Sequence, residues 1–143
     1  MTPTDPITIE AVVAAPPAEA WRAYTSPDAI TQWNQAVPEW HCPSAEVDLR
    51  KGGRHTARME ARDGSMGFDF GGTYEEVDEP KALTLRLDDG RRARTTFESE
   101  GSGTRVRTVF DPEGTNPVEM QRQGWQAILN SYAAHVERAS KGE

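Results

Sequence analysis

Hydrophobic and polar side chains alternate along most of the chain, and this alternation predicts a fold rich in β-strands. A period of two is typical of a strand with one buried and one solvated face. Asp63-Gly64 and Asp89-Gly90 separate such segments and favour tight hairpins. Because strands joined by tight turns run antiparallel, we expect one antiparallel sheet of six to seven strands. The expected strands cover residues 7–13, 45–50, 54–62, 66–77, 83–88, 92–97 and 105–110.

Two short helices are predicted after the first strand. Pro16-Pro17 ends that strand and opens a helix over residues 18–24, because proline is tolerated in the first helical turn. Ser26-Pro27 is a second start signal, for a helix that ends near Trp33. About a dozen residues that follow are expected to form a loop, which carries Trp40, His41 and Cys42.

The last segment predicts one long helix that covers the buried face of the sheet. Asn116-Pro117-Val118-Glu119 reads as a variant capping box, and the helix is expected to run to about Arg138. At 100° per residue, its core-facing positions fall within an arc of roughly 100°. These positions are Val118, Gln121, Trp125, Ile128, Leu129, Tyr132 and Val136. Gly71-Gly72 indicates a bulge or bend, which a sheet needs in order to curve around such a helix.

Length and charge set limits on the classes of function. The 143 residues fit a single domain, residues 1–143, and the net charge of −7 argues against nucleic-acid binding. The chain shows no signal peptide and no run of about 20 apolar residues, so we expect a cytoplasmic protein without a membrane span. Five arginines cluster in sequence and are expected on a solvated outer sheet face beside acidic residues: Arg91, Arg92, Arg94, Arg105 and Arg107.

The predicted order of elements resembles the START-like superfamily, also called SRPBCC or helix-grip. Within it, short motifs are similar to the family related to the C-terminal domain of the activator of the heat-shock-protein-90 ATPase. The motifs are Ala15-Pro16-Pro17 with Trp21, Trp33, Asp48-Leu49-Arg50 with Gly52-Gly53, Gly72-Thr73-Tyr74, Asp89-Gly90-Arg91, and Glu119-Met120-Gln121 with Gly124-Trp125 and Leu129. The resemblance implies an α+β helix-grip fold: a curved antiparallel sheet around a long C-terminal helix, with two short helices after the first strand.

The resemblance also implies an apolar cavity between the sheet and the long helix. Members of the superfamily bind lipids, hormones or polyketides there, and some catalyse cyclisation. The name-giving family binds a chaperone and has an additional N-terminal domain. Because 143 residues leave no room for that domain, we favour a small-molecule role over a cochaperone role.

Small side chains beside large ones on the inner face, such as Ala57 and Ala93, favour a void over dense packing. A few polar groups in an apolar lining are typical of ligand sites, although the same residues would also suit a filled core. We predict that a small hydrophobic molecule, lipid-like or aromatic, contacts a set of inner residues. The set is Trp33, Trp40, His55, Met59, Phe68, Phe70, Tyr74, Thr95, Phe97, Thr108, Gln121, Trp125, Ile128 and Tyr132.

Candidate catalytic chemistry is sparse. The sequence has no nucleophile elbow, phosphate loop or dinucleotide fingerprint, so we predict no catalytic residue and no cofactor. His41 and Cys42 lack further ligands at metal-site spacing, so no metal site is expected. The alternatives are a polyketide cyclase-like enzyme with His55 or Tyr132 as acid or base, and a chaperone partner. Homodimerisation is left open.

Overall fold

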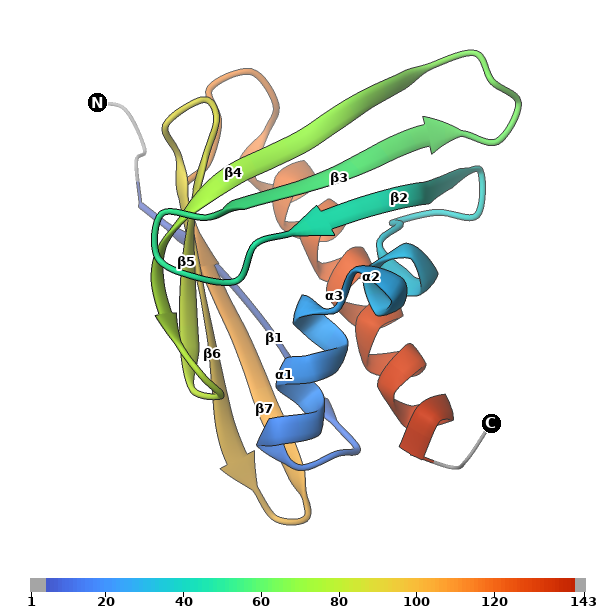
Figure 1. The fold of residues 1–143 in the computed structure, drawn as a ribbon. Coiled ribbons are helices and arrows are strands. Elements are labelled where there is room, and N and C mark those ends of the chain that lie inside the picture. The colour runs from blue at the N-terminus through green and yellow to red at the C-terminus, as the bar shows by residue number, and fades with distance from the viewer. Residues whose placement is uncertain (1–4, 141–143) are drawn as a thin grey trace.

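The computed structural model describes residues 5–140, and it has the expected α+β helix-grip architecture (Figure 1). The ends of the expected domain, residues 1–4 and 141–143, lie outside the described part. The strands are β1 (Ile7–Val13), β2 (Trp40–Val47), β3 (Arg54–Ala61), β4 (Gly67–Asp78), β5 (Ala82–Leu87), β6 (Arg92–Glu100) and β7 (Gly103–Phe110). The helices are α1 (Pro17–Thr25), α2 (Pro27–Trp33) and α3 (Val118–Ser140).

The seven strands form one antiparallel sheet in the order β1-β7-β6-β5-β4-β3-β2. From β2 to β7 every strand pairs with its neighbour in sequence, and β1 closes the order by pairing with β7. The expected hairpin turns place Gly64 and Gly90 at φ values of 78° and 97°, which suit glycine because it has no Cβ. The sheet curls around α3, and α1 and α2 lie beside it (Figure 1).

The prediction of a loop around Trp40 is wrong, because Trp40, His41 and Cys42 lie in β2. Strand β2 is at the edge of the sheet, where proline is tolerated because the missing N–H donor removes no ladder hydrogen bond. The pairing of β2 with β3 shifts register between His41 and Ser44, on either side of Pro43. Pro43 therefore interrupts the alternation pattern without preventing the strand.

The bulge expected at Gly71-Gly72 lies further along β4. The register shift against β5 falls between Tyr74 and Glu76. Gly72 instead allows β5 to approach closely, since a Cβ there would lie 2.6 Å from the carbonyl oxygen of Arg86.

Helix α3 follows the predicted core-facing stripe from its second turn onward. Leu129, Tyr132 and Val136 are buried, whereas Val118, at the start of the helix, is exposed. The expected cap by Asn116 does not form. Among the described residues, no hydrogen bond joins Asn116 Oδ1, the atom that would cap the helix, to the first turn of α3. The Nδ2 of the same amide donates to Glu113 Oε2 at 2.9 Å.

The helices contact only part of the sheet. Helix α1 packs on β6 and β7, α2 packs on β2, and α3 packs on β1 as well as on the two short helices. None of these main helix contacts falls on β3, β4 or β5. The inner faces of these three strands therefore arch over a space away from the main helix contacts.

Candidate ligand cavity

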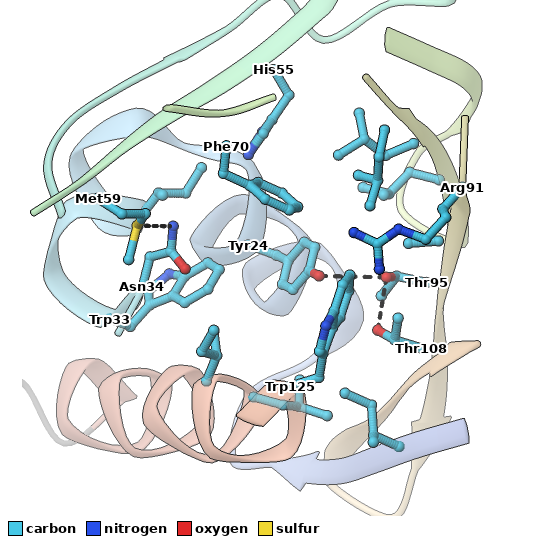
Figure 2. Close-up of a pocket in the computed structure, with 18 of the residues that line it drawn as sticks. Tyr24, Trp33, Asn34, His55, Met59, Phe70, Arg91, Thr95, Thr108 and Trp125 are labelled. Carbon is cyan, nitrogen blue, oxygen red and sulfur yellow. Dashed lines mark hydrogen bonds between the residues drawn. The ribbon is translucent and has the colours of Figure 1, made fainter. Parts of the chain in front are cut away.

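A cavity of about 270 Å³ lies between the inner face of the sheet and α3. It has nearly twice the volume of an engineered cavity of ~150 Å³ that binds benzene. Figure 2 shows aromatic side chains reaching into it from the sheet and from the helices. The lining consists of Ile9, Tyr24, Ile30, Trp33, Asn34, His55, Met59, Phe68, Phe70, Tyr74, Leu83, Leu85, Leu87, Arg91, Ala93, Thr95, Thr108, Trp125, Ile128 and Leu129.

Ten of the fourteen residues predicted to contact a ligand lie in this lining. They are Trp33, His55, Met59, Phe68, Phe70, Tyr74, Thr95, Thr108, Trp125 and Ile128. Most come from β3, β4, β6 and α3, where alternation and helical periodicity indicated an inner face. Phe68 is half exposed, so it marks a place where the lining meets solvent.

Two of the other four predicted residues fill the part of the interior beneath α1. Phe97 is buried, with its ring centroid 5.3 Å from that of Trp21. Tyr132 is fully buried, and its hydroxyl donates to the backbone oxygen of Ala20 at 2.6 Å. Helix α1 supplies both partners, so these inner positions are packed core and not cavity wall.

The remaining two predicted residues, Gln121 and Trp40, also lie outside the cavity lining. Gln121 serves the loop before α3, because its Nε2 donates to the backbone oxygens of Glu113 and Asn116 at 3.1 and 2.8 Å. Trp40 packs against Phe68 with 5.8 Å between ring centroids, and it does not line the cavity.

Ten lining residues were not in the predicted ligand-contact set: Ile9, Tyr24, Ile30, Asn34, Leu83, Leu85, Leu87, Arg91, Ala93 and Leu129. Ala93 was expected only as a small inner residue. The three leucines of β5 alternate as clearly as the chosen positions, so the same signal could have found them. Tyr24 and Asn34 lie in or just after the short helices. Those helices span too few turns for their periodicity to define a facing direction.

Four of the five clustered arginines confirm the expectation of a charged outer sheet face. Arg92 Nε donates to Glu75 at 2.6 Å, and Arg94 Nε donates to Glu76 at 2.9 Å. The other two form ion pairs with acidic residues on neighbouring strands: Arg105 with Glu10 and Glu100, and Arg107 with Glu10.

Arg91 departs from that expectation, because it lines the cavity. It directly precedes β6 and shares the strand parity of Ala93 and Thr95, which are both buried on the inner face. Strand parity was thus the signal that could have separated Arg91 from the outer arginines.

His55 lies on β3 with its ring facing Phe70 and Tyr74. Its Nδ1 is 3.2 Å from the hydroxyl of Tyr74, and the His55 and Phe70 ring centroids are 6.4 Å apart. Burial, assisted by the nearby Arg54 charge, lowers the pKa of His55 to about 4. Burial also raises the pKa of Tyr74. At neutral pH the cavity therefore presents a neutral imidazole beside a neutral phenol.

Three hydroxyls form a short chain on the opposite wall. The Tyr24 hydroxyl is 3.4 Å from Thr95 Oγ1, which is 2.8 Å from Thr108 Oγ1 (Figure 2). Burial raises the pKa of Tyr24, so its phenol keeps its proton. This wall adds polar groups without a charge to the lining.

Two further features of residues 5–140 concern metal binding and membrane insertion. No group of three or more His, Cys, Asp or Glu side chains is arranged there to hold a metal ion. None of the described helices is both long enough and apolar enough to cross a membrane.

A curled antiparallel sheet that encloses a cavity against a C-terminal helix defines the START-like, helix-grip class of protein (Figure 1). Residues 14–137 match the sequence model of the family described as "Activator of Hsp90 ATPase homolog 1-like protein", and the chain belongs to this family. No match was found among curated proteins. Proteins of this fold typically bind hydrophobic ligands.

Solved structures agree with this assignment. The solution structure of the AHSA1-like protein from Aeromonas hydrophila is 41% identical, with a TM-score of 0.89 and 94% of each chain covered. A solution structure from Cytophaga hutchinsonii is 43% identical, with a TM-score of 0.80 and 96% of each chain covered. A crystal structure from Nitrosomonas europaea shares the fold at 19% identity, with a TM-score of 0.82 and 99% of each chain covered.

Proposed function

We propose that the chain, folded as one domain over residues 1–143, binds a small apolar or amphipathic molecule in the cavity between the sheet and α3. The observation that carries this proposal is a cavity of about 270 Å³ whose lining is mainly aliphatic and aromatic, with few polar groups. Such a composition is typical of small-molecule sites, where apolar contact supplies affinity and a few polar groups fix orientation.

The aromatic walls of the cavity are held in place by neighbours, which favours binding. Trp125 stacks on Phe110 with 3.9 Å between ring centroids. Trp33 donates from Nε1 to the backbone oxygen of Ala23 at 2.9 Å, and its ring stacks on Tyr24. Because these rings are already fixed, a ligand would lose little affinity to ordering the walls.

The proposal can be tested with a neutral aromatic probe, 1-naphthamide, by isothermal titration calorimetry at pH 7. We expect wild-type protein to bind it, and Ala93→Leu to weaken binding at least about tenfold because the larger side chain occupies the cavity. Ala36→Leu is the matched control, since Ala36 is exposed before β2 and does not line the cavity.

Ile128→Trp, which fills the cavity from α3, provides a second variant in case Ala93→Leu fails to fold. Circular dichroism would verify the fold of each. Absence of binding to wild type, or unchanged binding by folded cavity-filling variants, would contradict the proposal.

A second candidate function is catalysis of the polyketide cyclase type, favoured by the His55–Tyr74 pair within the cavity. Tyr132, the other acid or base considered from sequence, does not line the cavity, and its hydroxyl is bonded to Ala20. A pKa of about 4 makes His55 a weak base at neutral pH, so we favour binding over catalysis. If turnover of a polyketide is detected, its survival in His55→Gln would exclude this role for His55.

The family description also names activation of the Hsp90 ATPase, which gives a third candidate. Here the partner would be a chaperone and the contact an outer surface. An ATPase assay with the purified chaperone decides this candidate, and stimulation that persists in Ala93→Leu would separate it from cavity binding.

A further inference from the structure

Arg91 places a cationic group against an otherwise uncharged cavity lining. Its side chain is only 23% exposed, and Figure 2 shows the guanidinium pointing from the sheet into the space between Phe70 and Trp125. Apart from His55, which is neutral at pH 7, no other titratable nitrogen or carboxylate is in the lining. Arg91 is therefore the charged side chain of the lining, and its Nε is also ion-paired with Asp89 Oδ2 at 2.8 Å.

Most hydrogen-bond donors of Arg91 are unused. Its Nε donates to Asp89 Oδ2 at 2.8 Å, on the turn outside the cavity. Among the described residues, its two terminal nitrogens have no hydrogen-bond partner. The nearby carboxylate of Glu113 accepts hydrogen bonds from the loop residues Thr115 and Asn116 instead. Four of the five guanidinium N–H donors thus remain available.

The hydroxyls of Tyr24, Thr95 and Thr108 lie beside Arg91 on the wall of the cavity, and all three residues line it. Thr95 contacts both other hydroxyls, and Tyr24 also interacts with Thr108. These hydroxyls make the wall beside Arg91 polar without adding a charge. A ligand group that accepts hydrogen bonds would therefore find its unused donors on Arg91.

Donors that face an apolar space favour a charged acceptor, and the planar guanidinium matches the two oxygens of a carboxylate. We propose that the ligand is a small aromatic carboxylate, with its ring among Phe70 and Trp125 and its carboxylate on the terminal nitrogens of Arg91. This inference rests on the proposed binding function and names the chemistry of its ligand. The outer arginines have glutamate partners and are not part of this site.

The test compares 1-naphthoate with its neutral counterpart 1-naphthamide, by calorimetry at pH 7. We expect wild-type protein to bind the carboxylate at least about tenfold more tightly than the amide, because a charged hydrogen-bonded pair is added. Arg91→Met should abolish that preference, measured as the ratio of the two dissociation constants within the same variant. Arg92→Met is the matched control: it removes the same charge from the outer face and should preserve the preference.

Each result decides for or against the carboxylate. Equal binding of the two compounds by wild type would overturn this inference while leaving the proposed binding function intact. Equal weakening of both by Arg91→Met would assign Arg91 a role in cavity shape and would also overturn it. Failure of both compounds to bind wild type would contradict both proposals. If Arg91→Met does not fold, Arg91→Lys keeps the charge without the planar fork and should reduce the preference.

Discussion

The interior beneath the sheet has two ends that use the same kinds of side chain but pack them differently. Under α1, Trp21, Phe97 and Tyr132 are buried, and they lie at van der Waals packing distance from neighbouring rings. Under β3–β5, Phe70 and Trp125 lie farther apart, with 6.3 Å between centroids, beside a cavity of about 270 Å³. Aromatic content therefore does not distinguish core from cavity.

The difference follows from where the helices sit. Helix α1 lies on β6 and β7, and its backbone provides the oxygen of Ala20 that accepts from Tyr132. No helix has its main contacts on β3, β4 or β5. Tyr24 and Trp33 form the boundary, because each packs against Tyr132 and also lines the cavity. The cavity thus lies under the part of the curved sheet that has no main helix contacts.

The largest expected difference between the packed end and the cavity end comes from removing one phenylalanine ring from each. Phe97→Ala should lower the free energy of unfolding by about 3–5 kcal/mol, because a fully packed ring is lost. Phe70→Ala should cost less than about 2 kcal/mol, since one side of that half-buried ring already faces empty space. Urea unfolding measures both. Equal losses would show that the two ends are packed alike.

This comparison also separates what the sequence could predict from what it could not. Alternation defined the inner faces of the strands and periodicity defined the buried stripe of α3, because both signals are local. Whether Phe97 meets another side chain or a cavity depends on α1, more than 70 residues away in sequence. Trp40 was placed in a loop because Pro43 hid an edge strand, and Arg91 was placed outside because neighbouring arginines outweighed its own parity.

The pH dependence of stability tests the cavity end through His55. Its pKa falls from an ordinary 6.5 to about 4 in the folded chain, so between these values the unfolded chain binds the extra proton. The contribution of neutral His55 to the free energy of unfolding is therefore fully present above pH 6.5. It is lost as the pH falls toward 4. At about 1.4 kcal/mol per pH unit, the total reaches up to about 3 kcal/mol.

Urea unfolding at several pH values, compared between wild type and His55→Gln, isolates this contribution from that of the carboxylates. The variant should lose less stability than wild type between pH 6.5 and 4. His135→Gln is the control, because His135 lies on α3 outside the cavity lining and its replacement leaves the His55 contribution in place. Parallel curves for wild type and His55→Gln would mean that the imidazole is solvated and charges freely in the folded chain.

The smallest effects should come from removing one tyrosine hydroxyl at each end, a change that keeps the ring. Tyr132→Phe should lower the free energy of unfolding by about 1 kcal/mol, because no water can replace the lost hydrogen bond to Ala20. The cost stays near that value since the Ala20 carbonyl keeps its partner within α1. Tyr74→Phe should cost less than about 0.5 kcal/mol, because the cavity admits a water molecule that can bond His55 Nδ1. If Tyr74→Phe proves as costly as Tyr132→Phe, the space beside His55 excludes water, and the hollow end is as dry as the packed one.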